Sequence, residues 1–350
     1  MSDDPKGGAR GGGSPAYLNV LRALLGFAVA AWIIHAIMNA PGVDVVAAFR
    51  GSNKRMLVAA VLAYAIGYPL MIVRWRMLLQ VQGLHLSPQT MLRLVLIGNF
   101  FNLVVPGAVG GDVAKAAVLA GQTPGKRVEA LLTIFVDRVL GAVGLLVLAA
   151  LSVAGSYSFL RQADPRLGVA ALAFGLFGLL SICGLWALVW RDRWAHLALA
   201  QAARRFVEKV IPLHVTTLAR RAVHALDLYR DTPGVLLGGA LLSVCVHAVA
   251  TLVVILLARA LGENHVGIAH YLLAVQVANG IAMVPLTPGG LGGRDLIVFL
   301  LLSHDGVDTA KAAAIPVMYS AIVTLWALVG GAVFIFDPIR GKMREAAGSQ

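Results

Sequence analysis

Charged side chains are scarce in this sequence: they make up 13% of its 350 residues, whereas hydrophobic residues make up 59%. A soluble protein of ordinary composition carries about 25% charged residues. The mean hydropathy is +0.81. These values exclude a typical soluble domain and predict an all-α, polytopic helical membrane protein, because helices satisfy their own backbone hydrogen bonds in lipid.

Cysteine is also rare. Cys183 and Cys245 both lie in apolar runs, which excludes a disulfide framework and predicts two buried small hydrophobic side chains. The sequence contains no Walker motif, zinc-peptidase helix, nucleophile elbow or metal-ligand cluster. We therefore expect no cofactor, no metal and no catalytic residue, and we expect that transport by this chain is not powered by ATP bound to it.

Acidic residues are fewer than basic ones, 17 against 29, and the net charge is +12. In a membrane protein this excess indicates basic side chains gathered on the cytoplasmic side rather than a nucleic-acid partner. We expect no nucleic acid to bind.

Long apolar runs are abundant. A helix needs about 20 apolar residues to cross the hydrocarbon core, and six segments are long enough: 17–39, 56–79, 129–154, 167–190, 233–261 and 310–336. Two shorter apolar segments, 90–105 and 269–286, end at glycine-rich breaks and are followed by short apolar pieces. This pattern predicts two re-entrant helical hairpins, at about 90–121 and 269–303.

The distribution of basic residues supports this topology. With both termini in the cytoplasm and both hairpins re-entrant, 21 of the 29 basic residues lie on the cytoplasmic side of the inner membrane. The two hairpins then enter from opposite faces, which predicts an inverted-repeat arrangement. Paired interruptions in two halves are a pointer to a transporter's substrate site.

The chain divides into a disordered tail at 1–16, a single transmembrane domain at 17–337 and a cytoplasmic tail at 338–350. Within the domain, 191–230 forms a basic cytoplasmic loop whose second part is amphipathic. Leu218, Ala222, Leu226 and Tyr229 share one helical face there. This face predicts either a helix on the inner membrane surface or a helix packed on the protein.

The two breaks read VPGAVGGDVAK at 105–115 and PLTPGGLGGRD at 285–295. Non-helical backbone inside a membrane must line protein or a wet cavity, and helix starts beside an arginine suit an anionic phosphate. The candidate substrate-binding residues in and near the breaks are Asn99, Asn102, Gly110, Gly111, Asp112, Lys115, Asn279, Thr287, Gly289, Gly290, Gly292, Arg294 and Asp295.

A simpler interpretation stays open beside this one. Glycines in membrane helices also serve only to allow close packing. Asp112 would then be a helix N-cap, and Asp295 a partner for Arg294.

Other charges lie inside or at the ends of apolar runs. We expect Asp137 and Arg138 to face the protein interior and find partners, either in a structural ion pair or on the substrate. Arg74 and Arg76 flank Trp75, a pattern typical of interfacial anchors. His35 and His247 are interpreted as packing residues.

Three stretches, GNFFNLVVPGAVGGDVAKAAVL, FVDRVLGAVGLL and VPLTPGGLGGRDLIVFLLL, together with RWRMLL at 74–79, resemble the lysylphosphatidylglycerol synthase transmembrane family. The resemblance covers about 17–337 and implies a lipid-translocating domain with re-entrant helices. It departs at Lys115, where an arginine is expected, and at Asp295, where a glutamate is usual. The residues that match family motifs are Asn102, Pro106, Gly110, Gly111, Asp112, Asp137, Arg138, Pro288, Gly289, Gly290, Gly292, Arg294 and Asp295.

The expected function is therefore that of a flippase or transporter for an anionic, glycosylated or otherwise amphiphilic membrane lipid: a phospholipid, a hopanoid or an isoprenoid-linked lipid. Lysyl transfer is not expected, because no aminoacyl-transferase domain is recognised in the chain. The alternatives are a membrane-embedded lipid-modifying transferase and an accessory subunit of a lipid or glycolipid biosynthesis complex. Expected partners are the lipid itself and either biosynthetic enzymes or a second copy of the chain.

Overall fold

The computed structural model describes residues 44–105, 110–123, 125–156, 227–282 and 287–336, together with residue 225 and scattered positions within 25–39 and 176–183. Nine α-helices are described within these ranges. The predicted tails at 1–16 and 338–350 and most of loop 191–230 lie outside the described residues.

Four long helices form the body of the protein: α3 (Lys54–Val81), α6 (Arg127–Gly155), α12 (Pro233–Ala260) and α15 (Thr309–Phe336). Each is long and apolar enough to cross a membrane. They confirm four of the predicted spans to within about two residues at each end, and the chain is a multi-pass membrane protein. The other two predicted spans, 17–39 and 167–190, lie outside the described residues apart from scattered positions.

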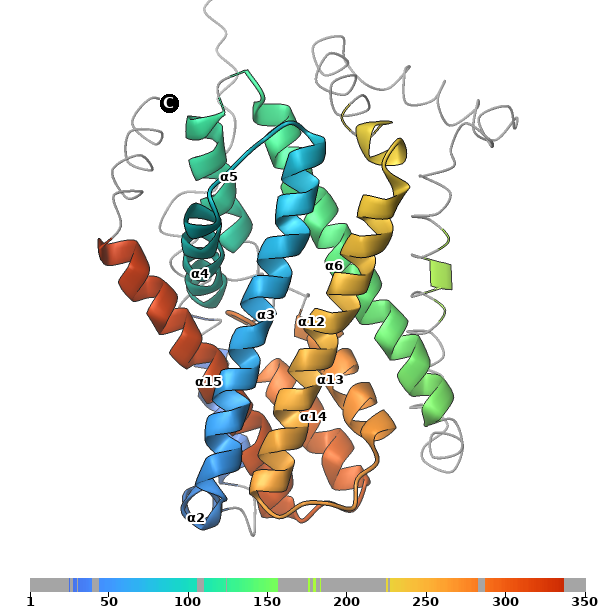
Figure 1. The fold of residues 1–350 in the computed structure, drawn as a ribbon. Helices are drawn as coiled ribbons and strands as arrows, with labels where there is room; N and C mark the ends of the chain where they lie inside the picture. The colour runs from blue at the N-terminus through green and yellow to red at the C-terminus, as the bar shows by residue number, and fades with distance from the viewer. Residues whose placement is uncertain are drawn as a thin grey trace, which may run out of the picture.

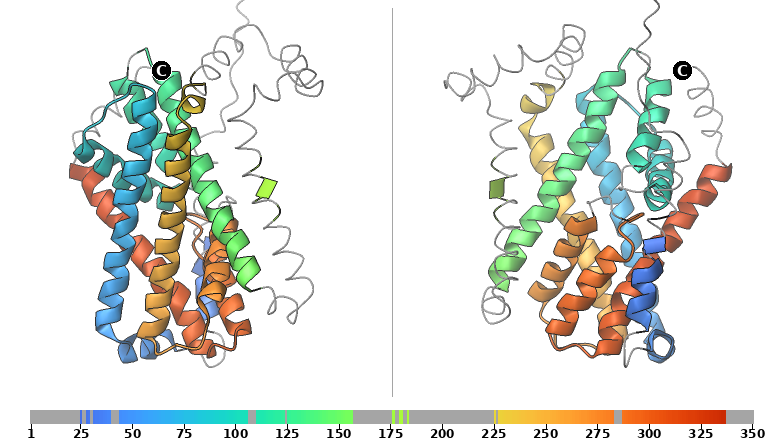
Figure 2. Two further views of the ribbon diagram at one scale, coloured as in Figure 1. Left: turned by 45° about the vertical axis from the view of Figure 1, so that its right-hand side comes forward. Right: turned by 180° about the vertical axis from the view of Figure 1, so that it is seen from behind.

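Shorter helices flank both glycine-rich breaks. α4 (Pro88–Val104) and α5 (Gly110–Gln122) pack on each other, and so do α13 (Ile268–Ala282) and α14 (Gly293–His304). The first pair lies toward one end of the bundle and the second pair toward the other (Figures 1 and 2). The predicted helix breaks are confirmed, although Pro106 itself lies outside the described residues.

A seven-residue helix, α2 (Val45–Gly51), precedes α3 and was not predicted from the sequence. Its N-cap is Asp44, whose side chain accepts a hydrogen bond from the Ala47 backbone N–H at 2.8 Å. A helix of this length is too short to register as a membrane span, so the apolar-run criterion misses it.

Glycines let the helices approach one another closely. A Cβ at Gly330 of α15 would lie 2.0 Å from the Leu96 carbonyl oxygen of α4, and one at Gly111 would lie 2.4 Å from the Gly98 carbonyl oxygen. Small residues at such contacts are typical of helix packing in membranes. For Gly110 and Gly111, which are both buried, these contacts favour the packing interpretation over direct contact with a substrate.

The described end of loop 191–230 packs on the protein. Tyr229 is buried, and its hydroxyl donates a hydrogen bond to the Leu78 carbonyl at 3.0 Å. The Gln82 side-chain amide donates to the Ala225 carbonyl at 2.8 Å. Tyr229, the described member of the predicted amphipathic face, therefore packs on α3.

The prediction that both cysteines are buried is wrong. Cys183 is exposed and Cys245 is half-buried, and both thiols are free. The physical reason is that the outward face of a membrane helix is apolar yet uncovered by protein, so an apolar run does not indicate burial inside the chain.

Candidate functional site

The second glycine-rich turn lies directly against the end of α4. A Cβ at Gly289 would be 3.5 Å from the Leu103 Cα and 3.6 Å from the Asn102 carbonyl oxygen. Gly289, Gly290 and Gly292 have φ angles of 59°, 73° and 76°, a left-handed conformation in which glycine carries no steric penalty. The second turn thus contacts the last turn of α4, which directly precedes the first break and lies nearly 200 residues away in the sequence.

A cavity of about 280 Å³ adjoins this contact, lined by residues of α3, α4, α12, α13, α14 and α15 and by Gly289. Its polar lining includes Asn99 and Asn102 from α4, Asn279 from α13 and Arg294 from α14. The structure thus brings four of the predicted site residues, together with Gly289, around one space. Aromatic and imidazole side chains complete the polar wall: Tyr64, Tyr68, His247 and Tyr319.

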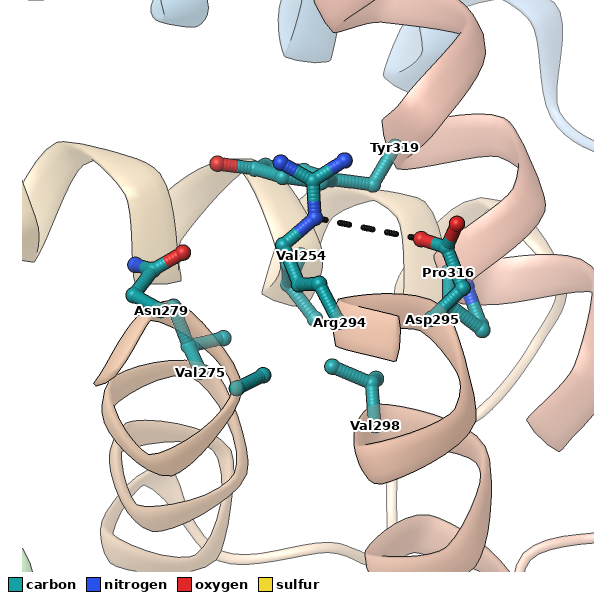
Figure 3. A pocket seen from close by; sticks show the side chains of 9 residues that line it. Val254, Val275, Asn279, Arg294, Asp295, Val298, Pro316 and Tyr319 are labelled. Atoms are coloured by element: carbon teal, nitrogen blue, oxygen red, sulfur yellow. Dashed lines mark ion pairs between the residues drawn. The ribbon is translucent and has the colours of Figure 1, made fainter. Parts of the chain in front are cut away.

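Arg294 is the charged centre of this wall. Its residue is 6% exposed, its Nη2 donates to Ser320 Oγ at 2.6 Å, and its guanidinium lies 4.7 Å from the centre of the Tyr319 ring. The Nε lies 3.8 Å from Asp295 Oδ1 and has no hydrogen-bond partner among the described residues. Figure 3 shows the guanidinium beside Tyr319, with the Asn279 amide nearby.

A second gap adjoins Arg294 but is too small for a ligand. It measures about 10 Å³ and is walled mainly by aliphatic side chains such as Val254, Val275 and Val298. This volume is at the lower limit for a single water molecule. Of these two spaces beside Arg294, the 280 Å³ cavity is the one with room for a ligand.

Asp295 has a structural role at the start of α14. It is fully buried, its Oδ2 accepts from the Gly292 backbone N–H at 2.9 Å, and its Oδ1 accepts from Ser320 Oγ at 2.6 Å. The first of these contacts is half of a capping box. Asp295 and Ser320 together hold the guanidinium of Arg294 in place, which confirms the expected pairing of Asp295 with Arg294.

Backbone N–H groups of the second turn were expected to face an anion, and for three of them this expectation is wrong. The N–H of Gly292 donates to Asp295, that of Gly293 donates to the Leu291 carbonyl at 2.9 Å, and that of Arg294 donates to the Gly290 carbonyl at 3.0 Å. The tight turn satisfies its own donors. Among the described lining residues, the Arg294 side chain is the arginine or lysine of the cavity wall.

The side-chain amides of the three asparagines differ in how many of their atoms are hydrogen-bonded to the protein. The Asn99 Nδ2 donates to the Tyr68 hydroxyl at 2.9 Å, and the Asn102 Oδ1 accepts from the Gly111 N–H at 2.8 Å. The Asn279 side chain makes no hydrogen bond to any other described residue. Asn102 thereby joins the two helices of the first hairpin, while Asn279 remains available.

Thr287 is buried just before the turn, and its carbonyl accepts from the Gly290 N–H at 3.3 Å. This contact gives it a part in forming the turn.

The remaining predicted charges form a separate cluster that is not part of the cavity wall. Asp137 accepts two hydrogen bonds from Arg74, from Nε at 2.7 Å and from Nη2 at 3.0 Å, and Arg74 also donates to Ser243 Oγ at 2.7 Å. Arg74 is 6% exposed and Trp75 1%. The interfacial-anchor interpretation of Arg74 is therefore wrong: a bidentate carboxylate partner on α6, which packs against α3, keeps it inside the protein.

Asp112 pairs with Arg138, with Arg138 Nε 2.5 Å from Asp112 Oδ2. The nearby Lys115 Nζ lies 4.8 Å from the centre of the Trp75 ring and makes no hydrogen bond or ion pair with another described residue. Asp112 therefore balances Arg138 rather than Lys115. The expectation that Asp137 and Arg138 find partners is confirmed.

Several residues that line the cavity were not predicted from the sequence as site residues. Tyr64 and Tyr68 stand four apart in α3 and so share one helical face, a spacing that could have indicated a polar stripe in an apolar span. His247, interpreted as a packing residue, lines the cavity, and its Nε2 lies 3.1 Å from the Gly141 carbonyl.

Among the described residues, no three histidine, cysteine, aspartate or glutamate side chains lie together as metal ligands would.

The fold and the cavity define a class of protein: a polytopic helical membrane protein with an interior pocket, lined by both polar and apolar residues, beside two pairs of shorter helices. Residues 20–331 match the family described as the lysylphosphatidylglycerol synthase TM region, and the chain belongs to that family.

Curated relatives include a UPF0104 membrane protein of Methanothermobacter thermautotrophicus, 24% identical over 281 residues, which cover 77% of this chain and 81% of that protein. A UPF0104 membrane protein of Pyrococcus horikoshii is 23% identical over 295 residues, covering 79% of this chain and 85% of that protein. The family takes its name from the membrane region of a lipid-modifying enzyme, which connects the chain to lipid-related membrane function.

Proposed function

We propose that this protein moves a lipid with an anionic headgroup from one leaflet of the membrane to the other. The observation that carries the proposal is the cavity beside the second glycine-rich turn, with the buried cation Arg294 in its wall. A cation in the wall of a cavity inside a membrane protein favours an anionic ligand, because charges are costly there and pair with opposite charges.

In this proposal the α4–α5 and α13–α14 pairs are re-entrant hairpins that enter the cytoplasmic membrane from opposite faces, as an inverted repeat. Their placement at opposite ends of the bundle (Figure 2) and the contact between Gly289 and Leu103 support this topology. Both chain termini are then cytoplasmic, as the distribution of basic residues indicates. The cavity lies near the middle of the bilayer, where transporters of this kind bind their substrates.

In the proposed mechanism, the headgroup of the lipid enters the cavity while its tails stay in the bilayer. The cavity, about 280 Å³, is slightly below the range of roughly 300–1,000 Å³ that is usual for pockets holding whole small molecules. It has room for a headgroup but not for acyl or isoprenoid chains, which stay in the bilayer. Arg294 binds the phosphate, and alternating exposure of the cavity to the two leaflets completes the transfer.

Two features support transport over a lipid-modifying transferase. The carboxylates nearest the hairpins are each held by a cation or by hydrogen-bond donors: Asp112 by Arg138, Asp137 by Arg74 and Asp295 by Ser320. In addition, none of the described residues lining the cavity is acidic. A general acid or base needs a free group within reach of the reacting atom. No carboxylate in the described lining provides one, and the lining histidine, His247, has its Nε2 engaged by the Gly141 carbonyl at 3.1 Å.

The test is lipid movement in proteoliposomes that hold the purified protein and phosphatidylglycerol with a fluorescent acyl chain. Quenching from outside reports the fraction in the outer leaflet over time, with and without an imposed pH gradient. We expect transport well above that of protein-free vesicles. Mass spectrometry of the same lipid should show no change in mass, whereas a changed mass would favour the transferase.

Variants of Arg294 connect this activity to the cavity. Arg294→Ala should slow transport by roughly 10- to 100-fold, because a hydrogen bond to a charged group contributes about 1.5–3 kcal/mol. Arg294→Lys keeps the charge beside Asp295 but loses the planar fork, so it should fold normally and transport at an intermediate rate.

The matched control is Arg50→Ala, which removes an exposed arginine at the end of α2 and should leave the rate unchanged. If Arg294→Ala and Arg294→Lys both transport at the wild-type rate, the cavity is not the path.

A further inference from the structure

An apolar groove lies between α2, α3, α12 and α15, at the end of the bundle where α2 leads into α3 (Figure 1). Its volume is about 420 Å³, and all of its described lining residues are apolar. We propose that this groove binds one acyl chain of a phospholipid of the surrounding bilayer, and that Lys54 holds the anionic headgroup of that lipid.

The groove is open to the membrane. Phe49 of α2 and Leu325 of α15 line it, and each is 49% exposed. Because α3 and α15 are both long and apolar enough to cross a membrane, the hydrocarbon of the bilayer covers their exposed faces. An acyl chain is therefore the occupant that the surroundings of the groove supply.

The groove is separate from the polar cavity that contains Arg294, and the two spaces share no lining residue. On α3 the boundary falls between Val61, which lines the groove, and Tyr64, which lines the cavity. Side chains join α3 to α15 at this level: Trp326 Nε1 donates to the Val61 carbonyl at 3.2 Å, and the rings of Tyr64 and Tyr319 meet edge to face with centres 6.3 Å apart. The proposed site therefore does not depend on transport through the cavity.

Lys54 places a positive charge at one end of the groove. Lys54, Leu57 and Val61 are spaced three and four residues apart and so share one face of α3, and the last two line the groove. The Lys54 Nζ also lies 4.3 Å from the centre of the Phe49 ring, another lining side chain. A cation at the end of an apolar groove complements a phospholipid, which joins an apolar chain to a negative phosphate.

The ammonium group of Lys54 has a donor left for this phosphate. It donates to the Phe49 carbonyl and, at 3.2 Å, to Ser52 Oγ, and these contacts help to cap the C-terminal end of α2. An ammonium has three donors, and Lys54 has no carboxylate partner among the described residues. Since lipid tails are as apolar as the groove itself, the contact with the phosphate selects the lipid, rather than burial of its tail.

The length of the groove matches one leaflet of the bilayer. Its lining on α15 extends from Val317 to Leu325, which is about 12 Å along a helix that rises about 1.5 Å per residue. The hydrocarbon of one leaflet is about 15 Å thick, half of the roughly 30 Å core. Lys54 is the first residue of α3, where a spanning helix meets the headgroups. A chain in the groove thus brings its phosphate to the depth of Lys54.

The test measures the thermal unfolding midpoint of the full chain in detergent with added phosphatidic acid or phosphatidylcholine of identical acyl chains. A lipid that binds the folded state alone stabilises it. Phosphatidic acid should therefore raise the midpoint of the wild-type protein by several degrees more than phosphatidylcholine does. Inorganic phosphate should leave the midpoint unchanged, because it has no chain for the groove; a shift equal to that of phosphatidic acid would contradict a lipid site.

Two tryptophan variants block the groove. Ala321→Trp and Leu325→Trp introduce a large side chain at positions that line it, and both should abolish the extra shift given by phosphatidic acid. The matched control is Ala332→Trp, at an exposed alanine eleven residues further along the same face of α15 and outside the groove. This control should keep the extra shift.

Lys54→Gln tests the charge and should reduce the shift with phosphatidic acid to that with phosphatidylcholine. Arg259→Gln, at an exposed arginine near the end of α12, should keep the difference between the two lipids. Arg294→Ala should also keep it, because the cavity is a separate space.

Three results would overturn the inference. The first is equal shifts for the two lipids in the wild-type protein, and the second is an undiminished difference in both groove-blocking variants. The third is loss of the difference in Arg294→Ala, which would assign the bound lipid to the cavity.

Discussion

At the residue scale, the ion pairs among the described charges in the middle of this protein hold the structure, whereas Arg294 lines the cavity. Arg74 and Asp137 form a bidentate pair between α3 and α6, and Arg138 and Asp112 connect α6 to α5. Arg294 instead donates to Ser320 and lines the cavity. Its place in the cavity wall is what assigns its role, because Lys115, which makes no ion pair or hydrogen bond with another described residue, does not line that cavity.

The Arg74–Asp137 pair makes the first prediction for stability. Asp137→Asn leaves a buried guanidinium without its counter-charge and should lower the free energy of unfolding by about 3–5 kcal/mol. Replacing both partners by apolar residues, Arg74→Met with Asp137→Leu, should cost less than either single substitution. Equilibrium unfolding in detergent, with all three variants compared, provides the measurement. Additive losses in the double variant would show that the two residues are not coupled.

At the element scale, the length of each apolar run predicted the described long helices closely, because the thickness of the hydrocarbon core fixes how many residues a helix needs. The breaks were equally visible, since glycine and proline clusters end helices. The sequence did not predict which face of each helix packs against which neighbouring helix. Arg74 and Asp137 are 63 residues apart, and nothing in either run states which helix it meets.

The same limit explains the error at Arg74 and the missed tyrosines. Beside Trp75 at the end of a run, Arg74 matches the pattern of an interfacial anchor, and only the opposing carboxylate on α6 distinguishes the two cases. Tyr64 and Tyr68 belong to a span that is apolar overall, and their role depends on α4 and α15 closing over them. Of the candidate site, the sequence predicted Asn99, Asn102, Asn279, Gly289 and Arg294.

Close packing at glycine gives a prediction for the α4–α15 contact. Gly330→Ala would place a Cβ 2.0 Å from the Leu96 carbonyl oxygen, so the helices must separate, and we expect a loss of roughly 1–3 kcal/mol. Gly121→Ala is the matched control, because no atom lies within 4 Å of its Cβ position. That variant should be unchanged or slightly more stable, by up to about 1 kcal/mol. Similar unfolding midpoints for the two variants would contradict the packing described for α15.

At the scale of the whole molecule, four long helices hold two pairs of shorter helices toward opposite ends of the bundle (Figure 1), and the second glycine-rich turn contacts the end of α4. The first hairpin supplies Asn99 and Asn102, and the second supplies Asn279, Gly289 and Arg294. Neither hairpin encloses the cavity alone, because the long helices α3, α12 and α15 complete its wall. Movement of one hairpin against the other would change which side of the cavity is open, and this is the change that alternating access requires.

The most direct test of this account is a disulfide between the two breaks. In a background with Cys183 and Cys245 replaced by alanine, Leu103→Cys and Gly289→Cys place two thiols where a Cβ at 289 lies 3.5 Å from the Cα of 103, close enough for a bond. Cysteine at 289 adopts a left-handed conformation at a cost of about 1–2 kcal/mol. The Gly289→Cys single variant must therefore transport lipid before the pair is interpreted.

Lipid movement by the paired variant is then measured in oxidised and in reduced proteoliposomes. We predict that the oxidised protein, cross-linked in high yield, stops moving phosphatidylglycerol and that a reductant restores the rate. Undiminished transport by the fully cross-linked protein would contradict the claim that the headgroup passes through a cavity that opens between these two turns.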